Sequence, residues 1–91
     1  SSRRRLQALL RDPARRPHVI TFTSSSTVRN FMDLLGRKRE NRRLLKGITA
    51  ASIGPVTSAT LRDLGLKPGV QARRYTIPGL VAVIVERRPR R

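Results

Sequence analysis

A strand pattern that runs directly into a helix start occurs three times in this chain. The strand patterns cover residues 18–22, 48–53 and 70–74. The turns that follow them are Thr23-Ser24-Ser25-Ser26, Gly54-Pro55-Val56-Thr57 and Tyr75-Thr76. Strands that alternate with helices of ten to twelve residues predict a parallel sheet with right-handed crossovers. The three polar turns then lie on one edge of the sheet, which is the edge where open α/β sheets bind ligands.

Apolar spacing and capping residues place the helices of this α/β fold. Helical spacing of apolar residues predicts one helix before Asp12-Pro13 and a second that ends at Gly36. Ser25 or Ser26 is the predicted N-cap of the second helix. A third helix opens at Pro55, and a fourth is capped by Thr76. The predicted order is α-β-α-β-α-β-α, and three parallel strands are few enough to indicate part of a larger domain.

Composition excludes several classes of function. The 91 residues contain no cysteine and one histidine, so the sequence predicts neither a metal site nor a cofactor held by thiolates. The longest apolar run, residues 79–85, is too short to span a bilayer, and we expect a cytoplasmic protein. The net charge of +16 attracts polyanions. A non-catalytic basic α/β protein that binds nucleic acid or another polyanion is therefore the alternative to a small-molecule site.

The polar turns supply the candidate binding residues. Hydroxyls and free N–H groups at a helix start bind carboxylates or phosphates, which predicts an anion site formed by the first two turns. The predicted binding residues are Thr23, Ser24, Ser25, Ser26, Gly54, Pro55, Val56 and Thr57. The alternative is that one serine caps the helix and that the other hydroxyls bond locally. A serine nucleophile is not predicted, because the flanking glycines and the histidine partner are missing.

Taken together, the three turns resemble a known family. Residues 20–31, which read ITFTSSSTVRNF, and residues 51–66, which read ASIGPVTSATLRDLGL, are similar to the C-terminal part of uroporphyrinogen-III synthase. The sequence YTIPGLV at residues 75–81 extends the resemblance, which covers residues 18–86. It implies a partial flavodoxin-like three-layer unit. It also implies conversion of hydroxymethylbilane to uroporphyrinogen III, with inversion of the D ring and loss of water, and without metal or cofactor.

The resemblance assigns roles and boundaries as well. It implies that the first two turns bind the eight carboxylates of the substrate and that Thr57 faces it; Tyr75 is a candidate general acid. We expect a basic helix and connector in residues 1–17, the family segment in residues 18–88 and a basic tail in residues 89–91. Family members have about 250 residues and a second domain, and the family domain takes its first strand from the chain's N-terminus. We therefore expect a fragment that is inactive alone.

Overall fold

A computed structural model describes residues 1–87 of the chain and shows the predicted alternation of helices and strands. The predicted tail of residues 89–91 lies outside the described residues. The helices are α1 (Ser2–Arg11), α2 (Ser25–Leu35), α3 (Arg39–Arg42), α4 (Pro55–Asp63) and α5 (Ile77–Arg87), with a 3-10 turn η1 (Arg43–Leu45). The strands are β1 (Val19–Phe22), β2 (Thr49–Ser52) and β3 (Pro68–Gln71). No helix in this part of the chain is long and apolar enough to cross a membrane.

The three strands form one parallel sheet in the order β1-β2-β3. Val19 pairs with Thr49, and the register shifts by one residue between Ala50 and Ala51 where β2 meets β3. The third strand was predicted at residues 70–74, but it begins at Pro68 and ends at Gln71. Proline is compatible with the first position of an edge strand, because the N–H it lacks is not needed there. The Pro68-Gly69 pair therefore starts the strand instead of preceding it.

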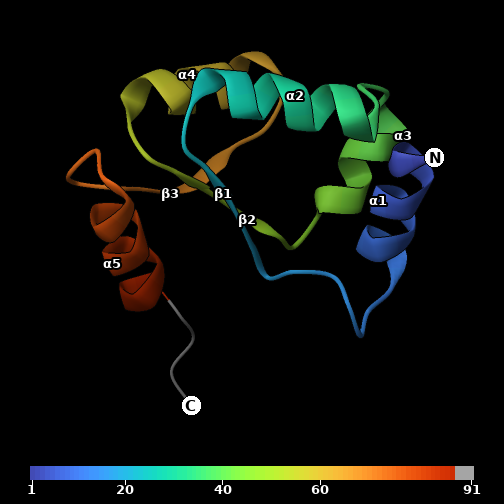
Figure 1. The fold of residues 1–91 in the computed structure, drawn as a ribbon, viewed down its shortest axis with the longest axis horizontal. Coiled ribbons are helices and arrows are strands. Elements are labelled where there is room, and N and C mark those ends of the chain that lie inside the picture. The colour runs from blue at the N-terminus through green and yellow to red at the C-terminus, as the bar shows by residue number, and fades with distance from the viewer. Residues whose placement is uncertain (88–91) are drawn as a thin grey trace.

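Helices cover both faces of the sheet, as in a partial flavodoxin-like unit. Figure 1 shows α2 and α4 above the strands and α5 below them. Strand residues alternate between the faces: Phe22 packs with Val28 of α2 and Leu61 of α4, whereas Ala51 packs with Leu80 of α5. The sheet is the middle of three layers.

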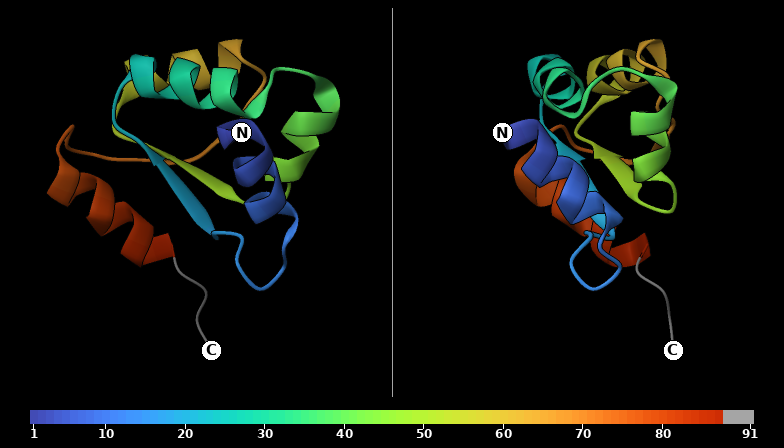
Figure 2. Two further views of the ribbon diagram at one scale, coloured as in Figure 1. Left: turned by 45° about the vertical axis from the view of Figure 1, so that its right-hand side comes forward. Right: turned by 90° about the vertical axis from the view of Figure 1, so that its right-hand side faces the viewer.

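The N-terminal helix α1 packs against the end of α2 and the η1 turn. Leu10 of α1 is buried with Met32 and Leu35 of α2. Figure 2 shows α1 beside the α3–η1 segment in both views. The sequence did not predict α3, because its four residues, RENR, have no apolar spacing.

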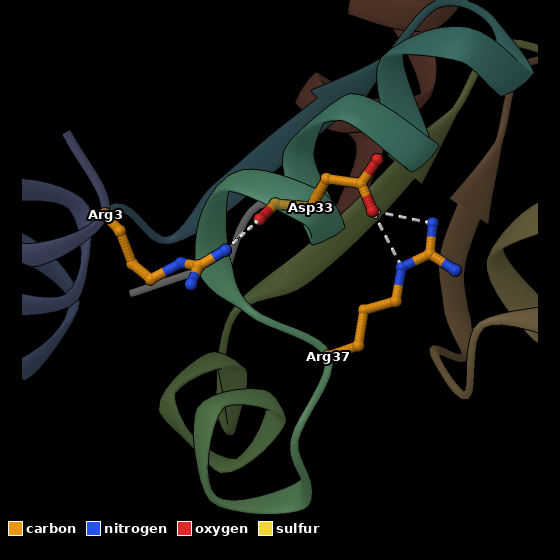
Figure 3. Close-up of polar contacts among 3 residues, drawn as sticks. All are labelled: Arg3, Asp33 and Arg37. Atoms are coloured by element: carbon orange, nitrogen blue, oxygen red, sulfur yellow. Dashed lines mark hydrogen bonds and ion pairs between the residues drawn. The ribbon is translucent and has the colours of Figure 1, made fainter.

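An arginine attaches α1 to the C-terminal end of α2. Arg3 donates from Nε to the carbonyl of Leu34 at 3.0 Å and from Nη2 to that of Asp33 at 2.8 Å. The Asp33 carboxylate accepts from Arg37 at 2.8–2.9 Å (Figure 3). Both arginines lie where the helix dipole favours a positive charge.

The helix ends follow the sequence signals except at one N-cap. Ser24 caps α2 instead of the predicted Ser25 or Ser26, because the Thr27 side chain accepts from Ser24 N–H while Ser24 Oγ accepts from Thr27 N–H. Gly36 and Gly65 have φ of 96° and 84°, as expected for glycines that end α2 and α4. Thr76 Oγ1 accepts from Gly79 N–H at 3.1 Å and caps α5 as predicted.

A two-pronged ion pair fastens α5 to the end of the sheet. Arg73, which follows β3, donates from Nη1 and Nη2 to the two carboxylate oxygens of Glu86 at 2.9 and 2.8 Å. These hydrogen bonds, and then the attraction between the two charges, lower the pKa of Glu86 below its ordinary value of 4.5. Arg73 therefore makes a specific contact between the end of β3 and α5.

We expect Glu86→Gln to lower the denaturant midpoint of the chain at pH 6–7 and to have no such effect near pH 2. The pKa of Glu86 is lower in the folded chain than in the unfolded chain, so the ion pair stabilises the folded state at pH values above the unfolded-state pKa. This stabilisation is lost as the pH falls through the folded-state pKa of Glu86. Urea unfolding of both proteins across this range measures the difference. Glu40→Gln, which removes an exposed acid outside both ion pairs found in residues 1–87, is the control. An equal effect of Glu86→Gln at both pH values would contradict the expectation.

Candidate functional site

The three strand-to-helix turns lie together at the carboxyl edge of the sheet. In Figure 1 they occupy the left-hand side, away from α1 and α3. Two contacts join them: Thr60 of α4 donates to Ser25 at the start of α2 over 2.8 Å, and the Tyr75 ring lies over Gly54. Residues that are up to fifty positions apart in sequence thus form one continuous surface.

In the first turn, two hydroxyl side chains make hydrogen bonds within the protein and two are exposed to solvent. Ser24 is occupied by the capping box with Thr27, and Ser25 is half-buried against Thr60. Thr23 and Ser26 are exposed. The two exposed hydroxyls are the ones that remain available to a ligand. The local-bonding interpretation holds for Ser24, whereas Ser25 is engaged by a residue 35 positions away.

The second turn leaves a helix N-terminus uncapped. Gly54 is the N-cap of α4 and has no side chain to accept a hydrogen bond, and Pro55 has no N–H to offer. The first bond within the helix runs from Ser58 N–H to Gly54 carbonyl, at 3.0 Å. The N–H groups of Val56 and Thr57 therefore point to the edge of the sheet without a capping side chain, an arrangement that favours an anion.

Thr57 itself is 4% exposed, whereas Val56 is 74% exposed. Thr57 occupies the first turn of α4 and belongs to a buried polar layer together with Ser58 and Thr60. Its side chain is therefore not open to solvent in this chain. Its predicted contact with substrate stays a prediction.

A buried network of hydroxyl groups between β2 and α4 holds the second turn in place. Ser52 Oγ donates to the Gly54 carbonyl at 2.8 Å and accepts from Gly54 N–H at 3.3 Å. Ser58 Oγ lies 2.8 Å from both Ser52 Oγ and Gln71 Oε1, which links β2, α4 and β3. Ser52 and Ser58 are fully buried. A buried network with its members paired rigidifies its surroundings, so this one fixes the position of Gly54.

The sequence did not identify these supporting residues. Serine in a strand and serine inside a helix carry no pattern of their own, and their pairing depends on how α4 crosses the sheet. The same holds for Thr60, whose contact with Ser25 spans 35 positions. The only available signal was the unusual number of hydroxyls in residues 57–60.

The third turn covers the second one. A Cβ on Gly54 would lie 3.2 Å from Cδ1 and 3.3 Å from Cγ of Tyr75, so the ring occupies the space that a side chain at 54 would fill. Tyr75 is 64% exposed. Glycine at this position is thus favoured by a close approach and not by its backbone angle, because φ of −175° is extended backbone.

The charges around the site suit an anion. Arg29 and Arg74 are exposed on α2 and on the third turn, and no acid occurs in residues 20–32 or 51–62. Residues 1–87 contain no cluster of three or more histidine, cysteine or acidic side chains that could hold a metal ion. The site consists of hydroxyls, helix N–H groups and one phenol, which are hydrogen-bond donors of the kind that suit a carboxylate.

Comparison with known proteins identifies the family. The family model described as uroporphyrinogen-III synthase HemD matches residues 1–82. The chain belongs to the uroporphyrinogen-III synthase family. The match includes α1, which lies before the residues that carry the resemblance in the sequence.

Relatives in the family match about three quarters of the chain. The uroporphyrinogen-III synthase of Synechococcus elongatus is 41% identical over 69 residues, which are 74% of this chain and 26% of that protein. A putative uroporphyrinogen-III synthase of Methanothermobacter thermautotrophicus is 36% identical over 67 residues, 72% of this chain and 26% of that protein. The chain thus spans about a quarter of the length of these relatives. No solved structure matches it.

Proposed function

We propose that this chain supplies one wall of the substrate site of a uroporphyrinogen-III synthase. The observation that carries the proposal is the meeting of the three turns at one edge, with the uncapped start of α4 at their centre. The substrate is hydroxymethylbilane, a linear tetrapyrrole with eight carboxylates. The reaction closes it to uroporphyrinogen III, with inversion of the D ring and loss of water.

In this proposal the wall acts by holding carboxylates. The N–H groups of Val56 and Thr57 and the hydroxyls of Thr23 and Ser26 would each donate to acetate or propionate groups of the substrate. Hydrogen bonds to a charged group are stronger than neutral ones and fix orientation. When the linear tetrapyrrole is held in one folded shape, that shape decides which ring carbon attacks. Orientation of this kind is a large part of catalysis. Tyr75, which is exposed on the third turn at this edge of the sheet, is the proposed general acid for departure of hydroxide.

A chimera tests the proposal without requiring activity of the chain alone. The matched 69-residue segment of the Synechococcus relative would be replaced by the corresponding part of this chain. We expect the chimera to form isomer III from enzymatically generated hydroxymethylbilane, measured by chromatography of the oxidised uroporphyrins. Changing Thr23→Val and Ser26→Ala together should lower kcat/KM by about tenfold or more, from the loss of hydrogen bonds to charged groups.

Two controls complete the test. Thr21→Val changes an exposed threonine of β1 that lies before the turn, and it should leave kcat/KM unchanged. The 91-residue chain alone should give only the isomer I that forms spontaneously. A folded chimera without synthase activity would overturn the proposed function. Formation of isomer III by the 91-residue chain alone would overturn the proposal that the chain supplies only one wall of the substrate site.

A further inference from the structure

A cavity borders β1 and β2 and extends toward the end of the sheet opposite the three turns. It has a volume of about 180 Å³ and is bounded by β1, β2, α2, the η1 segment and the connection from α4 to β3. Its apolar lining includes Ile20, Phe31, Leu45, Ile48 and Leu66. An apolar cavity of about 150 Å³ is known to bind benzene, so this volume accommodates a single ring.

Three cations complete the lining. They are Arg42, Lys46 and Lys67, and no acidic residue lines the cavity. None of the three takes part in the two ion pairs found in residues 1–87. The cavity therefore combines an apolar interior with positive groups that have no counter-charge beside them.

Arg42 carries an unusual feature. Its Nε atom is buried and has no hydrogen-bond partner, although buried polar atoms in native proteins are nearly always paired. The guanidinium lies across Gly65, where a Cβ would collide with Nη1. Gly65 thus admits the arginine to the cavity wall. Because the Nε atom has almost no accessible surface, a ligand in the cavity would meet the Nη donors of the guanidinium.

We propose that this cavity binds a single-ring organic carboxylate, with the ring on the apolar lining and the carboxylate on the Arg42 guanidinium. A planar fork of N–H donors matches a carboxylate, and an apolar pocket with one fixed charged group is the usual form of a small-ligand site. The site is separate from the proposed substrate wall and does not depend on that function. Benzoate is the probe that fits the volume and the charge.

The experiment is a titration of the ¹⁵N-labelled chain with benzoate and with benzyl alcohol, which keeps the ring without the charge. We expect saturable shifts at Ile20, Ile48 and Leu66, with a Kd on the order of 0.1–1 mM for a ligand of this size. Benzyl alcohol should bind about tenfold more weakly, because it lacks the charged acceptor.

Variants locate the site. Arg42→Gln should weaken benzoate about tenfold, since it removes the charge, and Arg43→Gln, an exposed neighbour outside the lining, should leave the Kd unchanged. Ala50→Leu places a larger side chain on the cavity wall and should abolish binding in a chain whose spectrum remains folded. The absence of saturable binding would overturn the proposal. Equal affinity for benzyl alcohol and benzoate, or an unchanged Kd in both Arg42→Gln and Ala50→Leu, would overturn it too.

Discussion

Leu61→Ala should lower the free energy of unfolding of this chain by about 2–5 kcal/mol, the range for truncation of a buried leucine. Leu61 is completely buried between α4 and the sheet, where it contacts Phe22 and Val28. The loss combines the transfer of the removed carbons to water with the cavity that they leave behind. A domain of this size is stabilised by only about 5–15 kcal/mol in total, so the variant loses a large part of its stability.

Urea unfolding followed by far-ultraviolet circular dichroism measures the change. Val56→Ala on the same helix is the matched control, because Val56 is 74% exposed. Its effect should stay within about 0.5 kcal/mol, as for most surface substitutions. Similar losses in the two variants would mean that the packing of α4 on the sheet is not what stabilises this chain.

The sequence predicted the parts of the fold that depend on local chemistry. The proline at the first helical position predicted the start of α4 at Pro55. At its other end, the Leu66 N–H to Leu61 carbonyl bond of 2.8 Å closes the helix beyond Gly65. The fold class followed from alternation alone. The third strand was misplaced because Pro68-Gly69 has the composition of a breaker, and the pairing of Pro68 with Ala50 is decided by the neighbouring strand.

The candidate site was predictable in position but not in detail. Parallel strands must bring their carboxyl ends to one edge, so the meeting of the three turns followed from topology. Which hydroxyl of the first turn remains free did not follow, because Ser24, Ser25 and Ser26 are equivalent in sequence. A local contact and a tertiary contact decide among them: the capping box with Thr27 engages Ser24, and Thr60 of α4 donates to Ser25.

Gly54→Val should lower kcat/KM of the active chimera by about 10²-fold, the effect expected when catalytic groups move by about 1 Å. Any side chain at position 54 meets the Tyr75 ring, and valine extends beyond the Cβ that already lies 3.2 Å from it. The extended backbone at Gly54 accepts valine without strain, so the expected cause is displacement of the third turn. Steady-state kinetics on hydroxymethylbilane, with unfolding curves for both proteins, measure the effect.

A double-mutant cycle separates this cause from a general requirement for glycine. Tyr75→Ala removes the ring, and Gly54→Val made in that background no longer has anything to displace. The loss due to Gly54→Val should therefore be much smaller there than in the presence of Tyr75. If the loss is the same in both backgrounds, valine acts directly on substrate at the uncapped start of α4, and the contact between the second and third turns is not what positions the site.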